Sequence, residues 1–152
     1  MQVRYPTSNN KKTNFTQEET ANPPEVRIEN PEGLYTLVMI DPDAGKKSEK
    51  NARPGNSDKY YLHWLVINIP ATGNINEGDD IVPYAGPTPP PNTGSHEYIF
   101  ILYRQKVSLM TGLMVKERPQ WSLNGFLQGK ELTEVKRQSV FVPKRQKLNA
   151  TM

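Results

Sequence analysis

Three dense runs of apolar residues, each bounded by turn-forming residues, limit the possible folds of this chain more than any other feature. The runs span residues 34–40, 60–69 and 97–104 and are rich in β-branched and aromatic side chains. Short runs of this composition predict strands rather than helices. Apolar residues occupy both alternating positions of each run, so we expect central strands covered on both faces of a sheet.

The stretches before and between these runs have weaker patterns. Residues 6–24 are polar and predict a long loop, whereas residues 24–29 alternate and predict a short edge strand. Residues 71–95 show neither a helical nor a strand pattern, and we expect them to lack regular structure.

The C-terminal part predicts a little helix followed by a strand. Residues 123–137 have weak helical spacing interrupted by two glycines, which predicts one or two short helices before a last strand at 138–143. The chain has 152 residues, about the size of one typical domain. We therefore expect a single, mostly-β domain spanning residues 1–152.

Several classes of protein are excluded or disfavoured by composition. The chain has no cysteine, which excludes disulfides, a thiolate nucleophile and zinc fingers that use cysteine. No window is apolar enough to cross a bilayer, and the first residues lack the apolar stretch of a secretory signal. We expect a cytoplasmic protein, with entry into the nucleus left open.

The net charge of +3 conceals an uneven distribution. Residues 1–103 contain nine Lys or Arg and thirteen Asp or Glu, whereas residues 104–152 contain ten and three. A basic C-terminal third predicts affinity for an acidic or phosphorylated protein partner or for lipid head groups. The alternative is that residues 144–152 form a basic tail that is merely solvated. No nucleic-acid-binding motif accompanies the charge, so direct nucleic-acid binding is not expected.

Residues 83–94 contain five of the fourteen prolines, which excludes a helix in this stretch. Such composition is typical of ligands for SH3 or WW domains. The stretch lies between two predicted strands rather than in a tail, which favours a rigid loop. Long ordered loops of this kind are often functional.

The two histidines of the chain lie on predicted strands. His63 is inside the second apolar run and His96 opens the third. Strand alternation predicts that each histidine shares a face with its neighbours two residues away. On this basis His63 is expected on a face with Tyr61, Leu65 and Ile67. His96 is expected on a face with Tyr98, Phe100 and Leu102.

If these strands are neighbours, the two imidazoles meet at one end of the sheet, where Asp41 and Asp43 follow the first apolar run. Imidazole N–H groups and the Tyr98 hydroxyl are donors suited to phosphate or another oxyanion. We expect anion affinity to rise as the pH falls through the imidazole range, and the aspartates to move that rise to higher pH.

Other interpretations of the same residues stay open. Two histidines with carboxylates could bind a divalent metal, as a metal-dependent phosphoester hydrolase would require. A nucleophilic triad using Ser57 or Ser95 is disfavoured because no Gly-x-Ser-x-Gly motif is present. Alternatively there is no site, and His63 is a hydrogen-bonded core residue while His96 is a loop residue.

Three segments, in this order and spacing, resemble the phosphatidylethanolamine-binding protein (PEBP) family, which includes the Raf kinase inhibitor protein and the plant flowering-time regulators. They are Tyr-Thr-Leu-Val-Met-Ile-Asp-Pro-Asp-Ala at 35–44, Leu-His-Trp-Leu-Val-Ile-Asn-Ile-Pro at 62–70, and Tyr-Ala-Gly-Pro-Thr-Pro followed by Gly-Ser-His-Glu-Tyr within 84–98. The residues of these segments are most similar to those of the plant members of the family. The similarity runs from about residue 24 to residue 105 and is looser beyond.

The resemblance implies a two-sheet, antiparallel β fold with short C-terminal helices, in a chain that lacks the first strands of a typical member. It also implies a small anion pocket for phosphate or a phospholipid head group, with no cofactor and no metal. The family is not generally enzymatic, which implies a binding protein that modulates signalling through protein partners. By position, the implied pocket residues are Asp41, Asp43, His63, Gly86, His96 and Tyr98, with Tyr61 at the rim.

Two departures from the family pattern affect this pocket. Glu97 follows His96 where relatives usually have Arg, which makes the pocket rim less positive. The chain has Gly86-Pro87-Thr88 where many relatives have Gly-x-Gly. Proline has no backbone N–H, so Pro87 leaves the expected pocket with one amide donor fewer than in those relatives.

Overall fold

The three apolar runs form adjacent central strands of one antiparallel sheet. The computed structural model describes residues 1–6, 13–42, 58–89, 95–112 and 116–143. In chain order the elements are β1 (Gln2–Arg4), β2 (Glu25–Arg27), β3 (Leu34–Asp41), β4 (Lys59–Ile69), the 3₁₀ turn η1 (Ile75–Glu77), β5 (Asp79–Val82), β6 (His96–Gln105), β7 (Trp121–Ser122), α1 (Leu123–Leu127) and β8 (Thr133–Val142).

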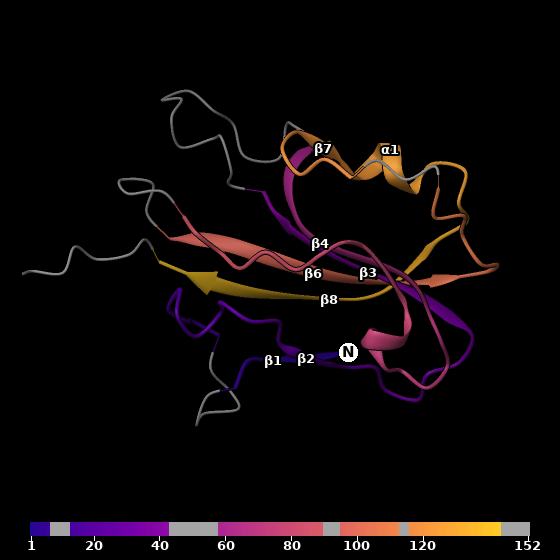
Figure 1. Cartoon of the computed structure of the whole chain (residues 1–152), viewed down its shortest axis with the longest axis horizontal. Helices are drawn as coiled ribbons and strands as arrows, with labels where there is room; N and C mark the ends of the chain where they lie inside the picture. Colours follow the sequence, from indigo (N-terminus) through magenta and orange to yellow (C-terminus); the bar gives the residue numbers. More distant parts are fainter. Residues whose placement is uncertain (7–12, 43–57, 90–94, 113–115, 144–152) are drawn as a thin grey trace, which may run out of the picture.

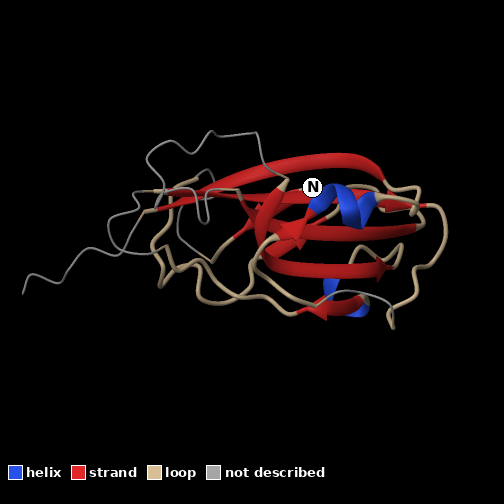
Figure 2. Cartoon of the chain, turned by 90° about the horizontal axis from the view of Figure 1, so that it is seen from above, coloured by secondary structure: helices blue, strands red, loops and turns tan. Residues whose placement is uncertain are grey.

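The main sheet has the strand order β5-β4-β3-β6-β8, and the short β7 pairs with the beginning of β4. All of these pairings are antiparallel. Strands β1 and β2 form a second, two-stranded sheet. The predicted two-sheet, mainly β architecture is confirmed, and the helical content of the described residues is limited to short pieces (Figure 2).

The main sheet is covered on both faces, as its composition predicts. Strands β1 and β2 lie on one side of it, and β7 and α1 lie on the other (Figure 1). The first face buries Leu37, Met39 and Phe100 with apolar residues of the N-terminal segment. The second face buries Val38 and Ile40 with residues of β7 and α1. Consecutive residues of β3 therefore pack into cores on opposite faces of the sheet. This explains why both the odd and the even positions of the strand are apolar.

The four strands predicted in the N-terminal two thirds of the chain are confirmed. The apolar runs correspond to β3, β4 and β6, and the edge strand predicted at 24–29 corresponds to β2. Described residues of the proline-containing stretch, 83–89, have neither helix nor strand, which agrees with the prediction from proline content.

Two predictions about the weaker patterns are wrong. Helix α1 ends at Leu127, and residues 133–137, predicted as helical, begin strand β8. Gly129 adopts a left-handed conformation with φ of +76°, which ends the helix, and β8 pairs with β6 along its length. Residues 79–82, predicted to be irregular, form β5 against β4.

The polar side chain of Gln105 is buried in the main sheet beside its apolar core. Gln105 accepts hydrogen bonds from the Thr36 hydroxyl at 2.7 Å and from the Asn68 backbone N–H at 2.8 Å. Its amide donates to the Asn68 side chain at 2.8 Å and to the Val107 carbonyl at 3.0 Å. The Asn68 side chain also accepts from Leu109 N–H at 2.8 Å. This network, which we call the Gln105 network, attaches residues 105–109 to β3 and β4.

Candidate functional site

A β-bulge in β4 determines where His63 points. Met39 pairs with Trp64, but the next residue, Ile40, pairs with Leu62, so His63 is an extra residue in its strand. A bulge of this kind bends the strand and redirects the side chain at the extra position.

The bulge changes the predicted grouping of side chains on β4. Leu65 and Ile67 are buried in the core on the α1 side of the sheet. The His63 ring instead lies against Tyr61, with ring centroids 4.9 Å apart, and against Tyr98, which belongs to the opposite core. The prediction that His63 shares a face with Leu65 and Ile67 is therefore wrong, whereas its grouping with Tyr61 is right.

His63 and His96 come together around Tyr98, although their strands are not neighbours. Strand β3 lies between β4 and β6. The Tyr98 ring is 5.1 Å from the His63 ring, edge to face, and 6.2 Å from the His96 ring, nearly parallel to it. All three side chains are almost completely buried, with 4% or less of their surface exposed. The predicted convergence of these residues is present.

Asp41 lies at the end of β3 and binds His96. His96 Nδ1 donates to Asp41 Oδ2 at 2.7 Å, and both side chains are buried. A carboxylate only accepts hydrogen bonds, so the proton of the neutral ring lies on Nδ1 and the lone pair on Nε2. Asp41 thus orients His96. Asp43 lies outside the described residues, and its role stays a prediction.

His63 is fixed by a backbone carbonyl in place of a carboxylate. Its Nδ1 donates to the Ala85 carbonyl at 2.7 Å, and the Ala85 N–H donates back to the His63 carbonyl at 2.9 Å. Because a carbonyl only accepts, neutral His63 has its lone pair on Nε2. The remaining nitrogen is therefore an acceptor in the neutral ring. It becomes a donor to an anion only when the ring is protonated.

Burial controls the charge of His63. Desolvation is the largest effect and lowers the pKa of His63 below its ordinary value. The hydrogen bond to Ala85 and the charge of Asp41 act in the opposite direction, whereas Arg118 and His96 lower the pKa further. The prediction that aspartates raise the titration range is wrong for His63, because burial outweighs them.

Gly86 allows two segments of backbone to approach closely. A Cβ atom at this position would lie 2.7 Å from the Thr20 carbonyl oxygen and 3.2 Å from Ala21 Cα. The neighbouring Tyr84 hydroxyl donates to the same Thr20 carbonyl at 2.6 Å. Gly86 therefore helps to fix the 83–86 segment against the N-terminal part of the chain. Its contribution to an anion pocket stays a prediction.

Two residues that hold this arrangement were not predicted. Ala85 acts through its backbone, so its side chain gives no signal in the sequence. Arg118 donates to the carbonyls of Leu62 at 3.2 Å, His63 at 2.9 Å and Pro83 at 2.6 Å. Arg118 lies beyond residue 105, where the family resemblance is looser.

The described residues contain no cluster of three or more His, Asp, Glu or Cys side chains that could hold a metal ion. His63, His96 and Asp41 belong to this described part, whereas Asp43 and Ser57 do not. The described geometry therefore gives no support to a metal-dependent hydrolase.

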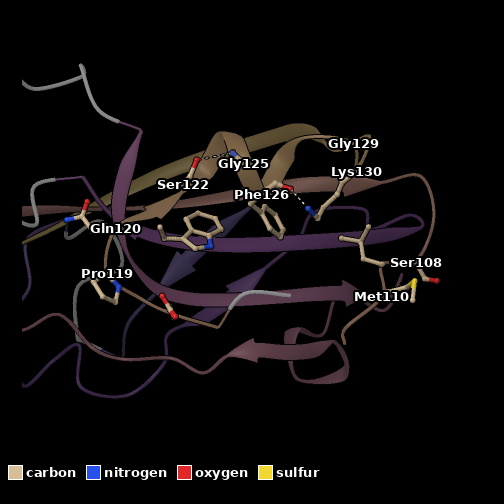
Figure 3. Close-up of a pocket in the computed structure, with 12 residues that line it drawn as sticks. Ser108, Met110, Pro119, Gln120, Ser122, Gly125, Phe126, Gly129 and Lys130 are labelled. Atoms are coloured by element: carbon tan, nitrogen blue, oxygen red, sulfur yellow. Dashed lines mark hydrogen bonds between the residues drawn. The ribbon is translucent and has the colours of Figure 1, made fainter. Parts of the chain in front are cut away.

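A separate groove of about 650 Å³ lies on the α1 side of the main sheet (Figure 3). It is lined by residues 108–110 and by the aromatic pair Trp121 and Phe126, whose ring centroids are 5.4 Å apart. Lys130 Nζ lies 4.8 Å from the Phe126 ring centroid and donates to the Phe126 carbonyl. None of the predicted site residues lines this groove.

Part of the predicted basic surface lies on β8. Lys136 and Arg137 are on its exposed portion, and Arg137 forms two hydrogen bonds with Glu134, at 2.8 and 3.0 Å. Residues 144–152, the predicted basic tail, lie outside the described residues.

The family model for phosphatidylethanolamine-binding proteins matches residues 5–142. The chain is 37% identical over 107 residues to Protein MOTHER of FT and TFL1 homolog 2 from Oryza sativa, covering 68% of this chain and 57% of that protein. It is 39% identical over 119 residues to a 26 kDa secreted antigen from Toxocara canis, covering 74% and 43%. The chain spans about half the length of the curated relatives it matches.

The fold is also similar to solved structures. The carboxypeptidase Y inhibitor, determined in complex with its cognate proteinase, matches with a TM-score of 0.70 at 20% identity, over 94% of this chain and 82% of that one.

Among the described residues, no helix is long and apolar enough to cross a membrane. The family model covers most of the chain and agrees with both the fold and the motifs. The chain therefore belongs to the phosphatidylethanolamine-binding protein family.

Proposed function

We propose that this protein is a non-enzymatic regulatory protein that binds a phosphate-type anion, free or as a phospholipid head group, at His63 and His96. The observation that supports this best is the pair of buried imidazoles that both lie against the Tyr98 ring. Each ring has its Nδ1 bound to an acceptor of the protein. The rings are thereby oriented before a ligand arrives, which lowers the entropic cost of binding.

The chemistry of the rings couples anion binding to a proton. A protonated imidazole donates through Nε2 and adds a positive charge, and hydrogen bonds of this kind are among the stronger ones in proteins. A phosphate that carries a proton can instead donate to the lone pair of a neutral ring. The phosphodiester of a head group has no such proton, so a hydrogen bond between its oxygens and Nε2 requires a protonated histidine.

We propose that regulation occurs through a protein partner of acidic or phosphorylated character. The carboxypeptidase Y inhibitor is complexed with a proteinase, so this fold supports protein binding in that protein. The basic residues after position 103 would attract an acidic surface. We also propose a cytoplasmic location, with entry into the nucleus. One relative is described as a secreted antigen, so fluorescence imaging of the full-length protein is the appropriate test.

Replacing either histidine with alanine should weaken anion binding about tenfold or more, because a charge-assisted hydrogen bond is lost. The measurement is a titration with inorganic phosphate and, separately, with glycerophosphoethanolamine, followed in ¹H–¹⁵N NMR spectra. In the wild-type protein, amides near His63, His96 and Tyr98 should shift. Comparison of the two ligands distinguishes free phosphate from a lipid head group.

Lys136→Ala is the matched control, since it removes an exposed positive charge on β8 without touching the site. If neither ligand shifts amides near His63 or His96 in the wild-type protein, the anion-binding proposal is wrong. Hydrolysis of p-nitrophenyl phosphate with added Mg²⁺ or Mn²⁺, abolished by His63→Ala, would instead support the hydrolase.

Anion affinity should increase as the pH falls below about 6.5, the ordinary imidazole pKa, because the pKa of His63 in the folded protein is lowered. Without ligand, the unfolded state binds more protons than the folded state between these two pKa values. The free energy of unfolding should therefore decrease as the pH falls through the same window. Thermal unfolding from about pH 8 to about pH 5, with and without phosphate, measures both effects. A pH dependence equal to that of His63→Ala would contradict this assignment.

A further inference from the structure

The bulge at His63 leaves an irregular stretch of backbone that is held by Arg118. The guanidinium donates from Nη1 to the carbonyls of Leu62 and His63 on β4, and from Nη2 to the Pro83 carbonyl, which precedes Ala85 by two residues. The Arg118 carbonyl accepts from the Leu62 N–H at 2.8 Å. One residue thus connects the bulge to the 83–85 segment through four hydrogen bonds.

These hydrogen bonds lie next to the one that orients His63, between its Nδ1 and the Ala85 carbonyl. The His63 carbonyl accepts from both Arg118 and the Ala85 N–H, while the Ala85 carbonyl accepts from His63 Nδ1. The position of the Ala85 carbonyl therefore determines which ring nitrogen carries the proton. Arg118 fixes the backbone at both sides of this contact, at His63 itself and at Pro83.

Arginine has the geometry that this role requires. Its planar guanidinium presents several donors in a fixed arrangement, whereas a lysine ammonium is a compact point charge. Both its carbonyl and its side chain bind β4, and the proline at position 119 favours an extended conformation for Arg118.

We infer that Arg118 is a positioning residue for the anion site, which holds the 83–85 segment against the β4 bulge so that His63 keeps its proton on Nδ1 and presents Nε2 to the ligand. This inference rests on the proposed function for its ligand. Its structural part, control of the His63 tautomer, is independent of any ligand.

The test compares Arg118→Met and Arg118→Lys with the wild-type protein. Long-range ¹H–¹⁵N NMR spectra of the imidazole nitrogens, recorded above the titration range of the ring, report the tautomer directly. The wild-type protein should show a protonated Nδ1 and a bare Nε2. In both variants the two His63 nitrogens should move toward averaged shifts, and phosphate affinity should fall about tenfold, as is typical when a group that orients a histidine ligand is removed.

Arg118→Lys separates geometry from charge. It keeps the positive charge and an aliphatic chain, but its single ammonium nitrogen cannot reproduce the spacing of Nη1 and Nη2 that binds the three carbonyls. It also serves if Arg118→Met fails to fold, which the amide spectrum shows. Arg137→Met is the matched control, because Arg137 is on exposed β8 and binds Glu134. Its imidazole spectrum should match that of the wild-type protein.

A wild-type tautomer in folded Arg118→Lys would overturn the inference, whatever the protein binds. If the tautomer changes but wild-type protein binds no phosphate, the positioning role stands and the proposed anion site fails. If the tautomer changes and phosphate affinity does not, Arg118 orients His63 without serving the anion site, and the inference fails in that part.

Discussion

Replacing Gln105 with alanine should lower the free energy of unfolding by about 3 kcal/mol, because several buried polar groups lose their partners at once. The Gln105 side chain is 5% exposed and satisfies the hydroxyl of Thr36, which is fully buried. It also joins Asn68, whose backbone has a positive φ of 56°, to the chain at Val107. Alanine would leave the Thr36 hydroxyl and the Asn68 N–H without the acceptor that the native side chain provides.

Chemical denaturation followed by tryptophan fluorescence measures this change. The matched control is Gln2→Ala, which removes an exposed glutamine from β1 and should change stability by less than about 0.5 kcal/mol. The Gln105 network also holds Leu109, which lines the groove beside α1. Amides of residues 107–110 should therefore exchange faster with solvent in the variant. A loss of less than about 1 kcal/mol would mean that water replaces the side chain.

The main strands could be predicted from the sequence because a strand buried on both faces is a continuous run of apolar residues, which is easy to recognise. Strands β3, β4 and β6 have apolar residues at odd and even positions, and each strand is buried along most of its length. The first part of β8 is different. Its residues are mostly polar and exposed, and pairing with β6 holds them in a strand. No local pattern contains that information, so weak helical spacing gave the wrong prediction there.

The side chains that cluster at the candidate site could be predicted from the sequence, but the backbone that positions them could not. His63, His96, Asp41 and Tyr98 were identified because their chemistry is visible in the residue types, and the structure brings them together. The bulge that turns His63 toward Tyr98 follows from the pairing register of β3 and β4. Register is a tertiary property, and a shift of one residue moves side chains to the other face.

The tautomers of the two histidines could be assigned only from the structure. From sequence, an imidazole is equally a donor or an acceptor at either nitrogen. The acceptors at Ala85 and Asp41 decide this for His63 and His96, respectively. For the proposed anion site, it follows that a hydrogen bond between Nε2 and a phosphate oxygen requires a proton on the ring or on the ligand.

Replacing Asp41 with alanine should lower the free energy of unfolding by about 3 kcal/mol, the cost of leaving a buried polar group without its charged partner. Asp41 is 3% exposed and His96 is 2% exposed, so solvent reaches neither side chain readily. The phosphate-induced shifts near His96 should also be lost, since the ring is no longer oriented. Glu25→Ala, which removes an exposed carboxylate on β2, is the control and should cost less than about 1 kcal/mol.

Asp41→Asn distinguishes the hydrogen bond from the charge. The asparagine carbonyl oxygen can still accept from His96 Nδ1, so stability should lie between those of the wild-type protein and Asp41→Ala. If Asp41→Asn is as unstable as Asp41→Ala, the negative charge rather than the acceptor stabilises this end of the sheet. If both variants are as stable as the wild-type protein, the 2.7 Å contact between Asp41 and His96 contributes nothing to folding. Asp41 would then matter only for the ligand, and phosphate affinity would be the one property that the two substitutions change.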